Sequence, residues 1–200
     1  MAVKTCQCPL DAVIPDLIDL DCPAKFGQIG KIAFQQVDQP FTDITDQSEW
    51  IAAIAASDDT KVQMSPIVHN QEATPAEPTV VGGAGSNEVY NGTVDYIGEG
   101  FYQMSFDLRN PTPQVLDALA AYECETSRIG VYLGGSDFVL SNGDGAAIEI
   151  SSFFIQKTPV FNGNVNANIS QMIFVFKRSD WFSKGLVNPI DFDFTSLVNA

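Results

Sequence analysis

The chain has 200 residues, of which 25 are acidic and 10 basic, so its formal net charge is -15 at pH 7. Apolar residues make up 45% of it, which is typical of a globular domain with a real core. Ten scattered basic residues cannot displace the counterions of a nucleic acid along a stripe, and an acidic surface is repelled by an anionic membrane. Composition therefore argues against a nucleic-acid reader and against a protein bound to such a membrane, and the acidic surface is equally explained by solubility.

The chain divides into three parts. Residues 1–27 are rich in proline and cysteine and predict an extended arm, with apolar residues that pack on the body or on a neighbour. Residues 28–180 predict one β-rich domain, and residues 181–200 a C-terminal arm with aromatic and acidic residues. The first residues lack the basic and apolar regions of a secretory signal, and we expect synthesis in a cytoplasm.

The first half of the domain predicts strands around one short helix. Residues 28–37 predict the first strand, and residues 60–69 return to an extended conformation. Between them lies a helix over about 46–56, in which Asp46 and Glu49 have the spacing of a capping box. Apolar residues follow Glu49 at helical spacing, so this helix has one buried face.

The middle of the chain predicts a long loop, a strand and a second helix. Residues 70–87 contain prolines and the run GGAGSN, and we expect the longest loop of the fold here rather than a phosphate site. Residues 101–108, FYQMSFDL, alternate apolar and polar residues, which indicates a strand with one buried face. Residues 109–125 predict a helix with prolines in its first turn.

From residue 128 onward the pattern is all β. Residues 128–141 predict a hairpin, and two further strands follow, over 147–160 and 169–180. The nearly continuous apolar run from Met172 to Phe176 predicts a central strand buried on both faces. About eight strands joined mainly by short turns predict an antiparallel β-sandwich or barrel with two short flanking helices on one side.

The four cysteines have two interpretations. Cys6, Cys8 and Cys22 lie in the N-terminal arm, and Cys124 ends the second predicted helix. If the arm folds back onto that helix, four thiolates form a tetrahedral zinc site, although Cys-x-Cys departs from the usual Cys-x₂-Cys spacing. Otherwise they are small buried residues, since disulfides are disfavoured in a cytoplasm, although a particle released from its host could oxidise them later.

The remaining polar residues predict no active site. His69 is the only histidine, and no sequence feature supplies the orienting partner that a catalytic histidine needs. Acid pairs suit a two-carboxylate hydrolase, but with 25 acids chance pairs are expected. Asn142 and Asp144 fit a plain turn better than a calcium loop. The acid pairs are Asp43 and Asp46, Asp58 and Asp59, and Asp191 and Asp193.

A few basic residues are candidates for contacts with a second acidic copy of the chain, because arginine and lysine side chains pair with carboxylates across interfaces. They are Arg109, Arg128, Lys177 and Arg178.

Three stretches carry a resemblance that extends over most of the chain. The first begins with CQCPLDAVIPD and ends with GQIGKIAFQQV. The second is TDQSEWIAAIAASDDTKVQMSPIV, and the third is VVGGAGSNEVYNG. With these stretches the chain resembles small virion proteins of tailed phages that infect Bacteroidetes, including crAss-like phages. The resemblance implies a tail-tube, ring or collar subunit, usually a β-sandwich with flanking helices, assembled around the DNA path. It brings no catalytic residues.

We therefore expect a virion structural protein, made in the host bacterial cytoplasm, and not an enzyme. Its expected partners are copies of itself in a ring and other virion proteins, with DNA passing an acidic lumen unbound. Two alternatives stay open: a head decoration or capsid-surface protein, and a β-sandwich carbohydrate-binding module. The last requires an exposed aromatic row, whereas we expect Trp50, Trp181 and Tyr102 to be buried.

Overall fold

The computed structural model describes residues 28–74, 79–82, 94–98, 101–143, 145–164, 166–177 and 186–199. The arm expected over residues 1–27 lies outside these ranges. In chain order the elements are β1 (Lys31–Gln36), α1 (Gln47–Ala55), β2 (Gln63–Met64), β3 (Val68–Thr74), β4 (Thr79–Gly82), β5 (Val94–Gly98), β6 (Gln103–Arg109), α2 (Pro113–Tyr122), β7 (Ile129–Gly134), β8 (Phe138–Ser141), β9 (Ile148–Ile155), β10 (Val160–Asn162), β11 (Ala167–Phe176), β12 (Leu186–Pro189) and a 3₁₀ helix, Phe194–Ser196.

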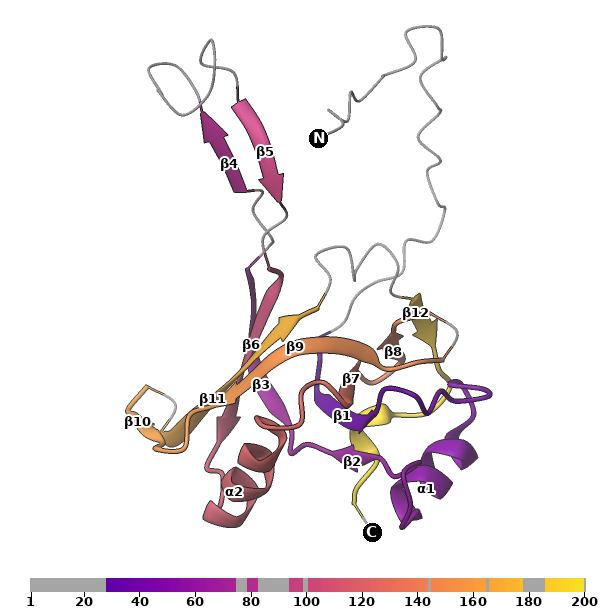
Figure 1. Cartoon of the computed structure of the whole chain (residues 1–200). Helices are drawn as coiled ribbons and strands as arrows, with labels where there is room; N and C mark the ends of the chain where they lie inside the picture. Colours follow the sequence, from indigo (N-terminus) through magenta and orange to yellow (C-terminus); the bar gives the residue numbers. More distant parts are fainter. Residues whose placement is uncertain are drawn as a thin grey trace, which may run out of the picture.

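Two antiparallel sheets share one strand. Sheet A has the order β12-β8-β7-β1-β2, and sheet B has the order β9-β11-β6-β3, with β10 paired to β11. Strand β9 pairs with β7 through Ile148 and Glu149, and with β11 through residues 150–155. It thereby forms the corner between the sheets, as in orthogonal packing, and Figure 1 shows it crossing the molecule. The predicted antiparallel sandwich with short helices is confirmed.

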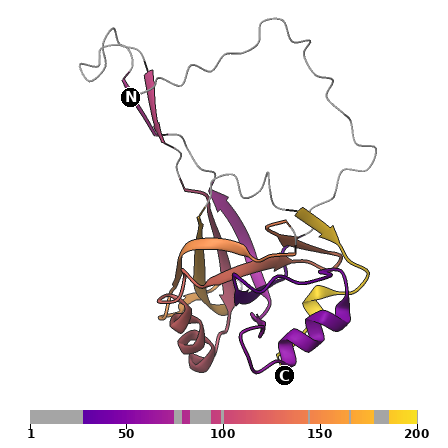
Figure 2. The ribbon, with the colours of Figure 1, turned by 45° about the vertical axis from the view of Figure 1, so that its right-hand side comes forward.

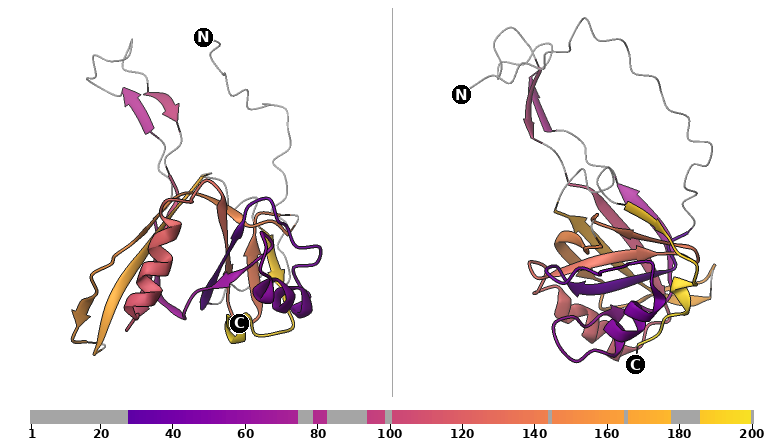
Figure 3. Two further views of the ribbon diagram at one scale, coloured as in Figure 1. Left: turned by 60° about the horizontal axis from the view of Figure 1, so that its bottom comes forward. Right: turned by 90° about the vertical axis from the view of Figure 1, so that its right-hand side faces the viewer.

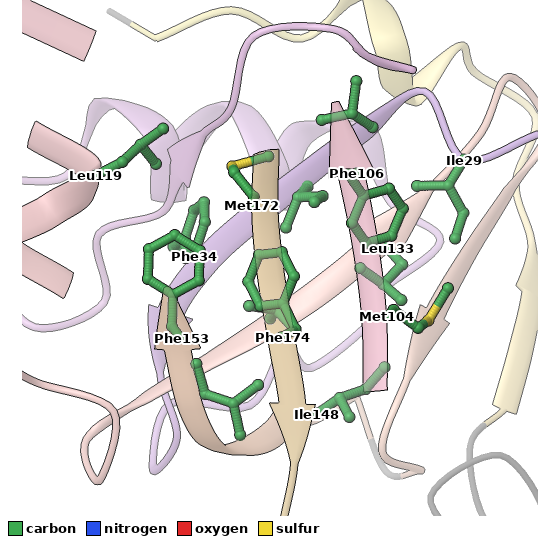
Figure 4. Close-up of a cluster of buried hydrophobic side chains, with 14 of the residues drawn as sticks. Ile29, Phe34, Met104, Phe106, Leu119, Leu133, Ile148, Phe153, Met172 and Phe174 are labelled. Carbon is green, nitrogen blue, oxygen red and sulfur yellow. The ribbon is translucent and has the colours of Figure 1, made fainter. Parts of the chain in front are cut away.

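The inner core lies between the two sheets. Alternate residues of β6 and β11 face it, and ring pairs such as Phe153 with Phe174, 4.8 Å apart, fill it (Figure 4). Helix α2 closes its open side with Leu116 and Leu119 (Figure 3). The alternation predicted for Met104, Phe106 and Leu108 is confirmed, because all three are buried in this core.

A second core covers the opposite face of sheet A. Trp50 of α1 is fully buried there, stacks on Phe41 at 4.2 Å and donates a hydrogen bond from Nε1 to the Ile44 carbonyl at 2.8 Å. Tyr132 of β7 and Phe194 of the 3₁₀ helix contact the same indole ring. Helices α1 and α2 therefore belong to different cores, not to one side of the sandwich.

The N-terminus of α1 departs from the predicted capping box. Asp46 is the N-cap, and its carboxylate accepts from the backbone N–H of Ser48 at 2.8 Å. The Glu49 carboxylate does not turn back to Asp46; it accepts from the backbone N–H groups of Thr42 and Asp43 at 3.1 and 3.0 Å. Glu49 therefore fixes the loop before the helix.

The C-terminal residues belong to the body of the domain. Strand β12 pairs with β8, and Phe192, Phe194 and Leu197 are buried in the second core. Asn199 then pairs its side-chain amide with both backbone groups of Met64, at 2.7 and 2.9 Å. The described part of the arm expected over 181–200 is thus packed into the fold, since its aromatic residues complete a core.

Residues 70–82 are not a simple loop. Strand β3 extends to Thr74 and β4 occupies Thr79–Gly82, while residues 75–78 and 83–87 of the expected loop lie outside the described residues. Strands β4 and β5 pair only with each other in the described structure and form a two-stranded sheet. Figures 1 and 2 show this hairpin extending from β3 and β6, away from both cores.

Strand β11 is central, but only one of its faces is fully buried. Met172, Phe174 and Phe176 face the inner core, whereas Ile173 and Val175 on the other face are half-buried. The prediction of burial on both faces was wrong because no described layer covers the outer face of sheet B.

Candidate interaction surfaces

Of the four predicted zinc ligands, only Cys124 lies in the described structure, so the zinc site stays a prediction. Cys124 follows the end of α2 and is exposed, so for this residue the small-buried interpretation was wrong. Cys6, Cys8 and Cys22 lie outside the described residues. Among the residues that are described, no group of three histidine, cysteine or acidic side chains has the arrangement of a metal site.

His69 lies on β3, half-buried and opposite Asp107 of β6. Burial lowers the pKa of His69, and the nearby Arg109 adds to this effect, while Asp107 opposes it. The imidazole is therefore predominantly neutral at pH 7. In the described structure His69 serves as a cross-strand residue of sheet B, with Asp107 of β6 as its register partner.

Three of the paired acids form one recurring turn. The carboxylates of Asp43, Asp58 and Asp193 each accept a backbone N–H and a hydroxyl from the threonine two residues later, with N···O distances of 2.9 to 3.1 Å. The hydroxyl contacts are 2.6 Å long. The threonine bonds hold the pKa of Asp43 and of Asp58 below the usual value. These acids cap turns, which explains their spacing without catalysis.

The turn at residues 141–146 is closed by its own backbone. Asn142 donates its N–H to the Ala146 carbonyl at 2.8 Å, and Ala146 donates to Gly143 at 2.9 Å. Gly143 and Gly145 have φ values of 64° and 71°, a conformation that favours glycine. Asp144 lies outside the described residues.

The candidate basic residues are dispersed. Arg128 pairs with Glu125 at 3.9 Å and Lys177 with Glu149 at 2.5 Å, both at the surface. Arg109 is exposed at the end of β6, and Arg178 lies outside the described residues. Exposed pairs of this kind contribute little to stability, so exchanging the contacts of Arg128 and Lys177 for contacts to another carboxylate would cost little free energy.

Among the residues that the structure describes, the large exposed aromatic side chains are phenylalanines. Trp50 is fully buried, as expected, and Tyr102 is half-buried with its ring 6.0 Å from that of Phe176; Trp181 lies outside the described residues. Phe154 on the outer face of sheet B is 54% exposed, and Phe161 on β10 is 64% exposed.

Phe154 belongs to an apolar strip on the outer face of sheet B. Phe154 lies opposite the half-buried Ile173 of β11, and Val160 of β10, itself 56% exposed, lies opposite Ile169. Isolated exposed apolar residues are normal, but neighbouring ones on a bare sheet face mark an interaction surface. We call these four residues the outer strip.

A continuous groove runs between α2 and the edge formed by β1 and β2. It consists of two adjoining hollows of about 310 and 280 Å³ that share Phe34, Gln63 and Tyr122. Its walls are β1 and β2 on one side and α2 with the turn that follows it on the other. We call this hollow the α2 groove.

Sequence reasoning missed both surfaces. The α2 groove joins residues from Lys31 to Asn199, which lie close together only in the folded chain. The outer strip had one signal, the pair Phe153-Phe154, because adjacent strand residues face opposite sides. One ring of such a pair must therefore point away from the core.

Comparison of the chain with models of known protein families finds no match, and a search among curated proteins finds no similar sequence. No helix among the described residues is long and apolar enough to cross a membrane. The fold and its surfaces therefore carry the functional argument.

Proposed function

We propose that this chain is a structural subunit of a tailed-phage particle, a tail-tube, ring or collar protein that assembles with copies of itself around the DNA path. The resemblance of three sequence stretches to virion proteins supports this proposal. The net charge of -15 also supports it, because an acidic lumen repels DNA and lets it pass unbound.

The β4–β5 hairpin is the observation that carries the proposal. A two-stranded hairpin is marginally stable on its own in water. This one lies beyond the cores and pairs with no other described strand. A partner surface would supply the missing packing, and in a ring each copy offers the same surface to the next.

The outer strip is a second candidate contact between subunits, because its side chains are apolar and partly exposed. Phe154 and Val160 are each more than half exposed on a sheet face that no described layer covers. Ring subunits meet through two different patches, one on each neighbour. The hairpin and the outer strip are two such patches on separate parts of the subunit.

Replacing residues 75–100 by Asn-Gly tests this proposal. Thr74 and Gln103 are register partners, so the replacement closes β3 and β6 as a short hairpin and keeps Tyr102 against Phe176. We expect sedimentation velocity to show self-association of the full chain and its loss in the shortened variant. Unchanged urea unfolding would verify that both cores remain, whereas equal association of the two proteins would refute the role of the hairpin.

A further inference from the structure

We propose that residues 10–21 of the N-terminal segment bind in the α2 groove of their own chain. The inference concerns contacts within one subunit and is independent of the proposed assembly. It rests on the chemistry of the groove, on the composition of this segment and on the place where β1 begins.

The groove is open and mainly apolar. Phe34 and Leu119 form part of its floor, and Val115, Ala118 and Tyr122 of α2 form one wall. Val198 at the rim is 71% exposed. A hollow of this size lined by apolar side chains is typical of a binding site, and covering it removes apolar surface from water at roughly 25 cal/mol per Å².

The groove also gathers basic residues in an acidic protein. Three basic side chains line it, Lys31, Lys61 and Arg128, against one acid, Glu125. They are half of the basic side chains that the structure describes, which are Lys31, Lys61, Arg109, Arg128, Lys157 and Lys177.

Two further hollows on the described surface have the opposite character. One contains Glu49 as its charged residue, and the other is lined by Asp43, Asp46 and Asp191. Of these hollows, the α2 groove favours an apolar occupant with negative charge.

Residues 10–21 have this composition. Their sequence, LDAVIPDLIDLD, combines leucine, isoleucine and valine with four aspartates and no basic residue. Apolar side chains suit the floor and the α2 wall, while carboxylates suit Lys61 and Arg128 at the rim. No covalent step is involved.

The chain can reach the groove. Lys31, the first residue of β1, lines it, and nine residues separate Asp21 from Lys31 by sequence, about 30 Å when extended. Attachment to the same chain raises the effective concentration of the segment to the millimolar range, about a thousandfold above a 1 µM solution. Binding within the chain is therefore favoured over exchange in dilute protein.

Site-specific photo-crosslinking tests this inference. We place p-benzoylphenylalanine at Ala118, an exposed α2 residue that lines the groove, and at Asp117, an exposed α2 residue that does not. Irradiation of the full chain at about 1 µM, followed by peptide mass spectrometry, should link position 118 to residues 10–21 and leave position 117 without that link. Equal linkage from both positions, or links from 118 to other segments, would overturn the inference.

Two further controls identify the occupant. In a mixture of isotopically light and heavy protein, binding within the chain gives crosslinked peptides of one isotope only. Mixed pairs would assign the groove to the segment of a second copy and contradict our inference. The double variant Leu17→Asp and Ile18→Asp should lower the crosslink yield at least about tenfold by removing apolar contacts, whereas Val3→Asp, outside residues 10–21, should preserve it.

Discussion

At the residue scale, the Tyr132 hydroxyl joins three segments of the second core. Tyr132 is fully buried on β7, and its hydroxyl lies 2.9 Å from Gln35 Oε1 on β1 and 2.9 Å from the Gly145 carbonyl. Its ring also packs against Phe41 and Trp50. The tyrosine therefore couples sheet A to the 141–146 turn and to α1.

Replacing Tyr132 by phenylalanine should lower the free energy of unfolding by about 1–3 kcal/mol at neutral pH, because the buried Gln35 Oε1 and the partly buried Gly145 carbonyl lose the one hydroxyl proton that they share. Urea unfolding measures this loss. The control variant Phe161→Leu replaces an exposed aromatic residue on β10. It should lower the free energy of unfolding less than Tyr132→Phe does.

The same residue predicts a pH dependence. Burial raises the pKa of Tyr132 well above the ordinary value near 10. Above pH 10 the unfolded chain loses the phenolic proton while the folded chain keeps it, so stability falls as pH rises. From about pH 9 to 12 the wild-type protein should lose more stability than Tyr132→Phe, and parallel curves would contradict this account.

At the scale of elements, α1 depends on its N-cap. The Asp46 carboxylate accepts from the backbone N–H and the hydroxyl of Ser48, at 2.8 and 2.5 Å. Trp50 and Ile54 of this short helix are buried, so fraying would open the second core.

The variant Asp46→Ala should cost about 1 kcal/mol of stability, and Asp46→Asn much less because asparagine also caps helices. Chemical denaturation of both variants measures the difference. Asp59→Ala removes the same charge from an exposed turn and should be nearly neutral. Equal losses for Asp46→Ala and Asp59→Ala would show that charge, not capping, is responsible.

Some helices and strands could be predicted from the sequence, and others could not. β6 and α2 were predictable because their apolar spacing matches the surfaces that they bury. Short β10 and β12 were not, since three or four residues give no period. Glu49 has the spacing of a capping box. Its carboxylate instead accepts hydrogen bonds from the backbone N–H groups of Thr42 and Asp43 in the loop before α1.

At the scale of the whole molecule, local pattern predicts the sandwich but not its surfaces. A sheet needs only alternating residues, whereas the α2 groove needs β1, β2, α2 and the C-terminal residues in one place. The C-terminal segment illustrates the limit: its aromatic residues suggested an arm, yet Phe194 completes the core around Trp50. Burial of that kind depends on the tertiary arrangement of sheet A.

We propose that this chain assembles with copies of itself. The most direct test is the molar mass of the unaltered protein, measured by light scattering over a concentration series. We expect a discrete multiple of the 21.7 kDa chain mass at micromolar concentration and above. A mass of 21.7 kDa at every concentration would contradict it.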